Sequence, residues 1–194
     1  MSSSGLRERK KQKTRWAIQE HALRLFTEQG YEATTIDQIA AAAEIPPSTF
    51  FRYFPSKEDV VIQDPYDEML LEGLLHAPRE LSPIAAIRMT LRSAFAEMGP
   101  AEQAKVLERT RLTMAVPALR AKSLENFLST LAILREGLSA RTGRDPEDFT
   151  VRVVAGAIVG AFVSTLELWS KVDDGDLPEL MDRTLAQLES GLEL

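Results

Sequence analysis

Residues 48–59, STFFRYFPSKED, bring together side chains that can bind a polyanion and read base edges. Four aromatic residues fall between Phe50 and Phe54, in a chain with only two Trp, three Tyr and eight Phe. A core segment would not carry Arg52 among them, and a solvated loop would not carry four rings. A guanidinium beside a phenol and hydroxyls can hydrogen-bond phosphates and base edges in a DNA major groove.

Helical spacing divides this segment into two faces. On a helix beginning about Pro47, Phe50 and Phe54 lie four residues apart on one face and are expected to pack inward. The remaining side chains point wholly or partly away from that core, namely Ser48, Thr49, Phe51, Arg52 and Tyr53. An alternative stays open, in which Phe51 or Tyr53 packs against the following helix.

Three further helices are expected to hold this one in place. A long helix over residues 7–29 ends at Gly30, with an apolar face made by Trp16, Ile18, Ala22, Leu25 and Phe26. Thr35 and Gln38 form a capping box at the start of a short helix, and Ser56 caps a helix after Pro55. Two short helices joined by a tight turn, after a longer helix, are a helix-turn-helix pattern.

Charge is distributed unevenly along a chain whose net charge is −6. Residues 1–15 hold six basic residues against Glu8 alone, whereas the remainder is acidic. A basic arm beside a helix-turn-helix indicates a nucleic-acid partner, although such an arm alone is equally consistent with a solvated helix start.

Residues 7–60 resemble the DNA-binding domain of the TetR family of transcriptional regulators. The resemblance rests on LFTEQGYEATTIDQIAAAAEI (residues 25–45) and STFFRYFPSKEDV (residues 48–60). It implies an all-α protein with an N-terminal three-helix helix-turn-helix domain followed by a C-terminal helical ligand-binding and dimerisation bundle. The implied domains are a basic arm over residues 1–15, a DNA-binding domain over 7–56 and a bundle over 57–194.

The family pattern assigns roles to matching positions. The Thr35 and Lys57 positions contact phosphate, the Phe51 position usually carries a phosphate-binding tyrosine, and the Tyr53 position belongs to the reading face. The residues predicted to contact DNA are Arg7, Lys10, Lys11, Arg15, Thr35, Pro47, Ser48, Thr49, Phe51, Arg52, Tyr53 and Lys57.

Three positions depart from the family pattern. Phe51 lacks the phenolic hydroxyl, so that phosphate bond is lost, although its ring edge can touch a thymine methyl group. Glu44 stands where the turn usually has glycine, so either the turn differs or Glu44 adopts a positive φ. Pro46 and Pro47 replace common polar residues, so a relative's sequence preference cannot be copied.

Proline, glycine and cap residues divide the second half into further helices. The expected helices span residues 66–77, 83–98, 101–115, 117–142, 146–171 and 176–190, with Pro65 a bend or interruption after the segment that begins at Lys57. Residues 153–169, VVAGAIVGAFVSTLELW, are apolar all round and are therefore expected to be buried on nearly every side.

Small residues in this apolar helix predict close helix packing. The family resemblance favours a homodimer through the last two helices over an internal core helix. The predicted interface residues are Val153, Gly156, Gly160, Val163, Leu185 and Leu188.

The resemblance also implies a small-molecule effector in the bundle. The predicted ligand-binding residues are Phe95, Met98, Arg111, Leu112, Phe127, Leu131, Phe162 and Trp169, each equally compatible with ordinary core. Arg109, Arg120 and Lys122 are further cations near apolar stretches. Residues 117–149 are loosely similar to a TetR subgroup with an acyl-CoA-like ligand, so the effector is expected to be apolar or acyl-CoA-like.

Other function classes find little support. The chain has no cysteine and only His21 and His76, without metal-ligand spacing or a phosphate-binding glycine motif, so no enzyme, metal or cofactor is expected. The polar N-terminus and an apolar run of 11 residues at 153–163 predict no signal peptide and no membrane partner, hence a cytoplasmic protein.

The sequence therefore predicts a DNA-binding transcriptional regulator, a repressor that binds a palindromic double-stranded operator as a homodimer and is released by a small molecule. Ligand is expected to move the segment 57–77, changing the separation of the two reading helices. The alternative is a helical protein-interaction adaptor whose helix-turn-helix no longer reads DNA.

Overall fold

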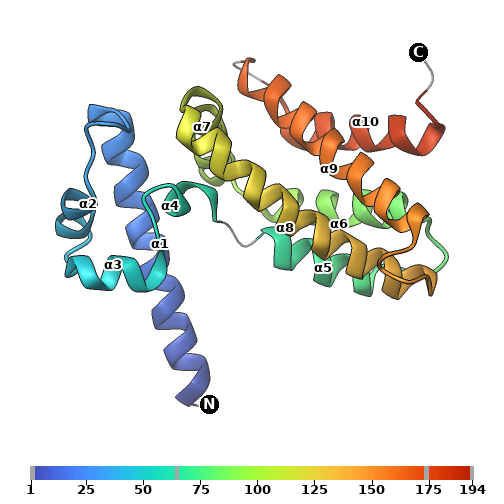
Figure 1. The fold of residues 1–194 in the computed structure, drawn as a ribbon, viewed down its shortest axis with the longest axis horizontal. Coiled ribbons are helices and arrows are strands. Elements are labelled where there is room, and N and C mark those ends of the chain that lie inside the picture. The colour runs from blue at the N-terminus through green and yellow to red at the C-terminus, as the bar shows by residue number, and fades with distance from the viewer. Residues whose placement is uncertain (1–2, 64–65, 173–174, 193–194) are drawn as a thin grey trace. The chain divides into compact units, whose positions relative to one another are not determined.

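The computed structural model describes residues 3–63, 66–172 and 175–192, leaving aside the side chains of residues 3–9 and 66–68. Throughout this described part the regular secondary structure is helical, as predicted (Figure 1). The chain divides into two compact units, one formed by residues up to 63 together with 116–122, the other by 64–115 and 123–194.

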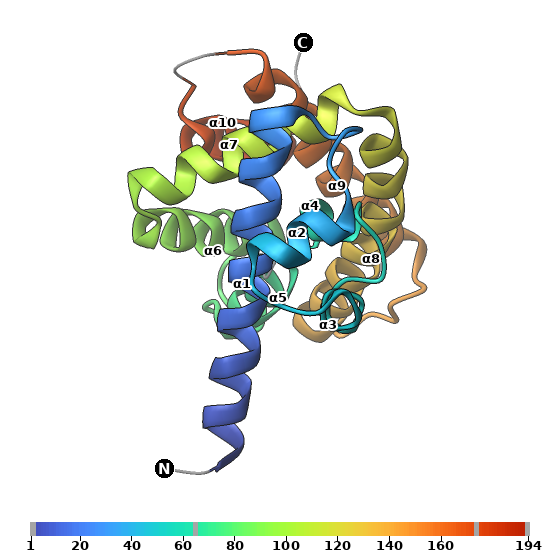
Figure 2. The ribbon, with the colours of Figure 1, turned by 90° about the vertical axis from the view of Figure 1, so that its left-hand side faces the viewer.

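Four helices make up most of the first unit. They are α1 (Ser3–Gln29), α2 (Ile36–Ala42), α3 (Pro47–Tyr53) and α4 (Asp59–Ile62). Gly30 follows α1 with φ of 87°, the left-handed stop that was predicted. The basic arm is helical from Ser3 onward, and this end of α1 extends beyond α2 and α3 in both views (Figures 1 and 2).

Buried apolar side chains from all four helices form the core of this unit. Ile18, Ala22, Ile39, Phe50 and Phe54 are fully buried. The prediction for Trp16 was wrong, because its side chain is 59% exposed on the outer side of α1. Spacing alone placed it at the edge of the apolar stripe, where a large ring can face either way.

The boundary between the units differs from the predicted one at residues 56 and 57. Helix α4 packs on α1 and belongs to the first unit, which also takes in the start of α8 (Pro117–Thr142). Leu119 in that start is fully buried. Gln63 after α4 is extended, with φ of −74° and ψ of 125°, so the segment beginning at Lys57 is not one continuous helix. Pro65 lies outside the described residues.

The second unit contains five further helices and the rest of α8. They are α5 (Tyr66–His76), α6 (Pro83–Glu97), α7 (Pro100–Ala115), α9 (Phe149–Ser170) and α10 (Leu177–Ser190). Helix α9 begins three residues after the predicted Pro146, because the Asp148 carboxylate accepts hydrogen bonds from the amides of Thr150 and Val151.

A continuous core of aliphatic side chains joins these helices. Leu74, Ile87, Leu134, Ile158 and Leu185, from five different helices, are almost completely buried in it. Glycines allow α5 to lie close to its neighbours: a Cβ at Gly73 would clash with the side chain of Thr90.

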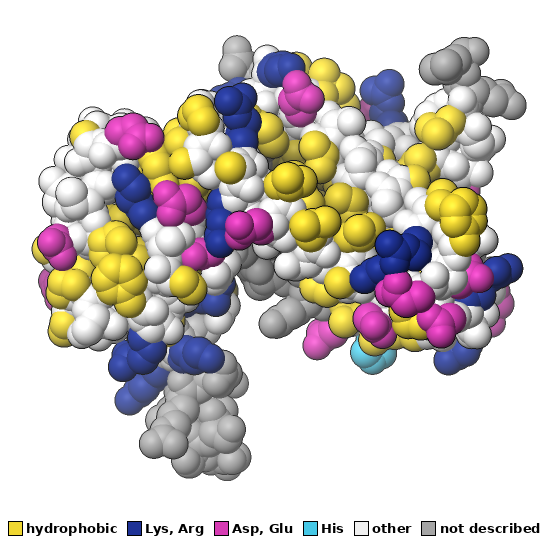
Figure 3. Space-filling model, viewed as in Figure 1, with side chains coloured by type: hydrophobic (Ala, Val, Ile, Leu, Met, Phe, Trp, Pro, Cys, Tyr) yellow, Lys and Arg dark blue, Asp and Glu magenta, His cyan; other side chains and the backbone are white. Residues whose placement is uncertain are grey.

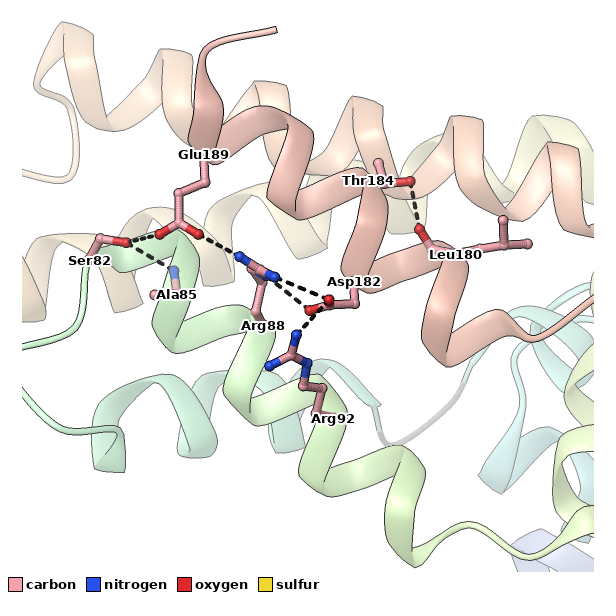
Figure 4. A network of polar contacts seen from close by, with 8 residues as sticks. All are labelled: Ser82, Ala85, Arg88, Arg92, Leu180, Asp182, Thr184 and Glu189. Carbon is pink, nitrogen blue, oxygen red and sulfur yellow. Dashed lines mark hydrogen bonds and ion pairs between the residues drawn. The ribbon is translucent and has the colours of Figure 1, made fainter.

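A charged network fastens α10 to α6 (Figure 4). Arg88 donates to both carboxylate oxygens of Asp182, at 2.9 and 3.1 Å, and Arg92 donates to the same carboxylate at 2.6 Å. Arg88 also donates to Glu189 at 2.7 Å, and Glu189 accepts a further bond from Ser82. The hydrogen bond from Arg88 lowers the pKa of Asp182 to about 2, and those from Ser82 and Arg88 lower the pKa of Glu189.

Helix α9 is less buried than predicted. Only 22% of its most apolar 18-residue window is buried, although the helix is long and apolar enough to span a membrane by length and composition alone. Val153 and Leu168 are 51% and 54% exposed. Within one copy of the chain, therefore, the outer side of α9 is uncovered.

Candidate nucleic-acid interface

Helix α3 is built as the sequence predicts. Pro46 precedes the helix in an extended conformation and Pro47 occupies its first turn, where a missing N–H loses no bond. Phe50 and Phe54 are fully buried, with ring centroids 5.9 Å apart. Phe54 is extended, with φ of −136°, and ends the helix before Pro55.

The opposite side of α3 faces solvent. Phe51 is 52% exposed and its ring meets that of Phe50 edge-on at 5.7 Å. The Arg52 guanidinium lies 5.4 Å from the centroid of the Tyr53 ring. Ser48 and Arg52 are exposed and make no side-chain hydrogen bond to any described residue. The side-chain donors of Ser48 and Arg52 are therefore available to a ligand. Pro47 is also exposed, whereas Thr49 and Tyr53 are half-buried.

The turn before α3 contains a strained residue. Glu44 has φ of 55°, so of the two predicted outcomes the positive φ is the one observed. The turn is closed by Ile45 N–H donating to the carbonyl of Ala40 at 3.0 Å. A residue with a Cβ in this conformation costs about 1 kcal/mol relative to glycine.

The predicted capping box at α2 is present. Thr35 Oγ1 accepts from the amide of Gln38 at 3.2 Å, and Gln38 Oε1 accepts from the amide of Thr35 at 2.8 Å. Gln29 at the end of α1 donates to Gln38 and to the buried Thr34. Thr35 itself is exposed, so its hydroxyl oxygen can also meet an external group.

Lys57 is held by the turn that precedes α2. Its ammonium donates to the carbonyls of Tyr31 and Thr34, at 2.9 and 3.1 Å, and lies 4.1 Å from the centroid of the Tyr31 ring. Two of its three donors are therefore engaged inside the protein. The Tyr31 hydroxyl donates to Glu58 at 2.6 Å; burial and this contact raise the pKa of Tyr31. Burial opposes the shift at Glu58, but the bond from Tyr31 lowers the pKa of Glu58.

Arg15 is also turned toward the protein. It donates to Gln63 Oε1 at 3.0 Å, and its guanidinium lies 5.0 Å from the centroid of the Phe54 ring. Lys10 and Lys11 remain exposed, and lysine and arginine side chains gather at this end of α1 (Figure 3). The side chain of Arg7 lies outside the described residues. The arm therefore presents cations, but Arg15 braces α1 against α3 and α4.

A cavity of about 450 Å³ in the second unit is lined by side chains from α5 to α10. Four predicted ligand-binding residues line it: Phe95, Met98, Phe127 and Phe162. Four others do not. Arg111, Leu112, Leu131 and Trp169 lie outside its wall.

Three of these four side chains make other contacts within the protein. Arg111 donates to the carbonyls of Ser170 and Val172, at 3.3 and 2.7 Å, and so closes the end of α9. Trp169 is 3% exposed and its indole N–H donates to Gly175 at 2.7 Å. Leu131 packs against the aliphatic core.

Several lining residues were missed by the sequence analysis as site residues. The apolar ones come from helices whose whole inner face is apolar, so no signal marked them: Met69, Leu70, Leu91, Val106, Val159, Leu166 and Met181. The polar ones include Glu97, Glu102, Arg109 and Asn126. Of these, only Arg109 had a sequence signal, as a cation near an apolar stretch.

The residues predicted for the dimer interface differ in how exposed they are. Val153, Gly156 and Gly160 lie on the uncovered side of α9, and a Cβ at either glycine would meet no other atom within 4 Å. Val163 and Leu188 are half-buried. The prediction for Leu185 was wrong, because its side chain is fully buried in the core of its own copy.

Within the described ranges, no group of three histidine, cysteine or acidic side chains could hold a metal ion.

Both halves of the chain match known protein families. Residues 18–63 match the family described as bacterial regulatory proteins, tetR family, and residues 81–193 match the MftR C-terminal domain. The HTH-type transcriptional regulator TcmR of Streptomyces glaucescens is 33% identical over 191 residues, which cover 91% of this chain and 81% of that protein.

Solved structures agree with this assignment. FadR of Bacillus subtilis in complex with stearoyl-CoA superimposes with a TM-score of 0.61 and 25% identity, covering 92% of this chain and 99% of that chain. FadR of Thermus thermophilus in complex with lauroyl-CoA shares the fold, with a TM-score of 0.54 and 24% identity, covering 93% and 95% of the two chains. The chain belongs to the TetR family and is a DNA-binding transcriptional regulator, not an enzyme.

Proposed function

We propose that this regulator represses transcription in the cytoplasm by binding a palindromic operator as a homodimer, and that a small molecule in the α5–α10 cavity releases it. The observation that carries the DNA half of this proposal is the outer side of α3. There the donors of Ser48 and Arg52 have no partner among described residues, on a helix fixed by two fully buried rings.

The proposed contacts follow from what each side chain does in the protein. Arg52 and Ser48 meet base edges, while the ring edge of Phe51 touches a thymine methyl group. Pro47, Thr49 and Tyr53 line the same groove. Thr35, Lys10, Lys11 and Arg7 contact phosphates, and Arg15 and Lys57 chiefly hold α1, α3 and the turn before α2 in position.

The uncovered side of α9 supports a homodimer. Val153, Gly156 and Gly160 present an apolar, small surface that a second helix can approach closely, with Val163 and Leu188 at its margin. A second copy gives this surface a partner and accounts for the low burial of so apolar a helix. Two reading helices about one DNA turn apart, roughly 34–36 Å, would bind a palindrome far more tightly than one.

The wall of the cavity supports an apolar effector. Most lining side chains are aliphatic or aromatic, and the described polar ones include one arginine, Arg109, against two carboxylates, Glu97 and Glu102. The two FadR relatives bind acyl-CoA thioesters. The apolar chain is therefore the part of an effector that this wall recognises, in an acyl-CoA or in a simpler amphiphile.

Selection of bound duplexes from a random pool tests the DNA-binding proposal. We expect a palindromic consensus with two half-sites, bound by two copies of the chain, and a steep loss of affinity with salt. Failure to enrich any sequence, or binding by a single copy, would contradict it.

A series of dodecyl compounds tests the effector. Dodecanol, dodecylamine, dodecanoate and dodecanoyl-CoA share one chain but differ in head group. Each is titrated against the protein bound to its selected operator. We expect DNA release by at least one of them, and the ranking shows how far the head group matters. If none releases the operator, and none displaces an apolar dye from the protein, the cavity is not the effector site.

A further inference from the structure

Lys122 of α8 is paired with a buried acid of the DNA-binding unit. Its Nζ lies 3.6 Å from Oδ1 of Asp59, whose side chain is only 7% exposed, whereas that of Lys122 is 33% exposed. Asp59 is the first residue of α4, and residues 116–122 belong to the same compact unit as α1–α4. A carboxylate this deeply buried depends on such partners, so the position of the cation matters to it.

Hydrogen bonds lead from Asp59 to the end of the reading helix. Asp59 Oδ1 accepts from Gln63 at 3.2 Å, and Gln63 Oε1 accepts from Arg15 at 3.0 Å. The Arg15 guanidinium lies over the ring of Phe54, the fully buried residue that ends α3. A displacement of Asp59 is therefore passed through direct contacts to the residue that fixes one end of α3.

The helix that carries Lys122 also lines the cavity. Asn126, one helical turn after Lys122, lines it together with Phe127 and Thr130 of the same helix. Helix α8 runs without interruption from Pro117 to Thr142. A shift or rotation of α8 caused by a bound molecule therefore moves Lys122 as well.

We propose that the Lys122–Asp59 pair is a coupling joint, through which α8 communicates occupancy of the cavity to the reading helix. Both are positioning residues, since neither lines the cavity nor lies on the outer side of α3. The inference rests on the proposed function, because it requires an effector in the cavity.

Substitution of Lys122 should weaken the coupling between the cavity and the reading helix without weakening operator binding itself. Asp59 would still accept from Ser56, at 2.8 Å, and from Gln63, so α4 and α3 keep their local contacts. Operator affinity without effector should therefore be nearly unchanged in Lys122→Met, and the effect should be confined to communication.

The experiment measures the dissociation constant of N-phenyl-1-naphthylamine, an apolar fluorescent dye, for the full-length protein alone and saturated with its selected operator. The ratio of the two constants is the coupling factor, about 5–150-fold where sites are allosterically linked. We expect Lys122→Met and Asp59→Asn to bring this ratio to within about twofold of one, and the double variant to lose nothing more.

Two control variants make the result specific. Lys122→Arg keeps a cation at the joint and should retain coupling. Lys171→Met removes a lysine whose partner Glu167 is on the surface and should behave as wild type. If Lys122→Met has the same ratio of dye dissociation constants as wild type, the coupling joint is ruled out, while the proposed function still stands. A ratio of one in the wild-type protein would contradict ligand release itself, and the joint with it.

Discussion

Helices α3 and α10 are both seated by buried apolar side chains, but they use their polar side chains in opposite ways. In α10, the carboxylates of Asp182 and Glu189 are bound by arginines of α6. In α3, Ser48 and Arg52 have no hydrogen-bond partner among described residues, and Arg52 only stacks on Tyr53.

This difference separates stability from recognition. Charged groups that are satisfied within the protein hold α10 in its place and have little left to offer a partner. Donors left unsatisfied on a rigid helix are ready for a ligand without reorganisation. Substitutions on α10 should therefore change stability, and those on the outer side of α3 should change DNA binding.

The largest expected effect is the loss of stability when a buried side chain that anchors α3 is removed. Phe50→Ala removes a fully buried ring and should reduce the free energy of unfolding by about 3–5 kcal/mol. Urea unfolding followed by circular dichroism measures it. Phe51→Ala, at the neighbouring half-exposed position, should cost only about 1 kcal/mol, since it loses one edge-on ring contact. Equal losses in the two variants would show that the two sides of α3 are not distinct.

Next comes the network that fastens α10. Asp182→Asn should reduce the free energy of unfolding by about 1.5–3 kcal/mol at pH 7, since it weakens three charge-assisted hydrogen bonds. Operator affinity should hardly change. A variant as stable as wild type would mean that the network contributes nothing beyond solvation.

The pKa of the Asp182 carboxylate predicts how the stability of the protein depends on pH. Its pKa is about 2 in the folded protein and 3.8 ordinarily, so the unfolded chain binds the proton more tightly. Its stabilisation is complete above about pH 4 and is lost as the pH falls toward 2. We therefore expect the free energies of unfolding of wild type and Asp182→Asn, measured at pH 7, 4 and 2.5, to approach each other only at pH 2.5.

Arg52→Ala should leave stability unchanged but weaken operator binding by about 1–3 kcal/mol. The physical reason is the loss of a bidentate donor to a base edge. Fluorescence anisotropy on the selected operator and on a shuffled duplex measures it. Equal weakening on both duplexes would show that Arg52 contacts phosphate instead.

The smallest effect is expected at the strained turn. Glu44→Gly relieves a positive φ of 55° and should stabilise the protein by up to about 1 kcal/mol. Because Glu44 lies before α3 rather than on its outer side, operator affinity should change little. Thermal unfolding tests the gain, and a loss of stability would mean that the Glu44 side chain makes a contribution larger than its strain.

The features predicted best from sequence are those fixed by neighbours in the chain. The capping box of Thr35 and Gln38, the first-turn position of Pro47, and the stop at Gly30 each depend on a few adjacent residues. The inward pair Phe50 and Phe54 follows from helical spacing alone. Most of the surface that we propose faces DNA lies on one short helix, so helical spacing was enough to predict which side of it points outward.

Features that depend on distant residues were predicted less well. Trp169 lies on an apolar helix and Leu185 on the apolar face of an amphipathic one, and only the packed structure shows that both faces are covered within one copy of the chain. Arg111 is a cation near apolar residues, but its partners lie about 60 residues away. The cavity draws on six helices, so no periodicity within one helix could define its wall.

Guanine methylation interference on the selected operator tests the central claim most directly, that the outer side of α3 reads DNA in the major groove. Arginine most commonly recognises guanine through N7 and O6. We predict that N7 methylation blocks binding at one guanine or more in each half-site, with half-sites about one helical turn apart, and that Arg52→Ala relieves this interference at a single position per half-site. Binding that is indifferent to methylation at every guanine, with equal affinity for shuffled duplexes, would contradict the account.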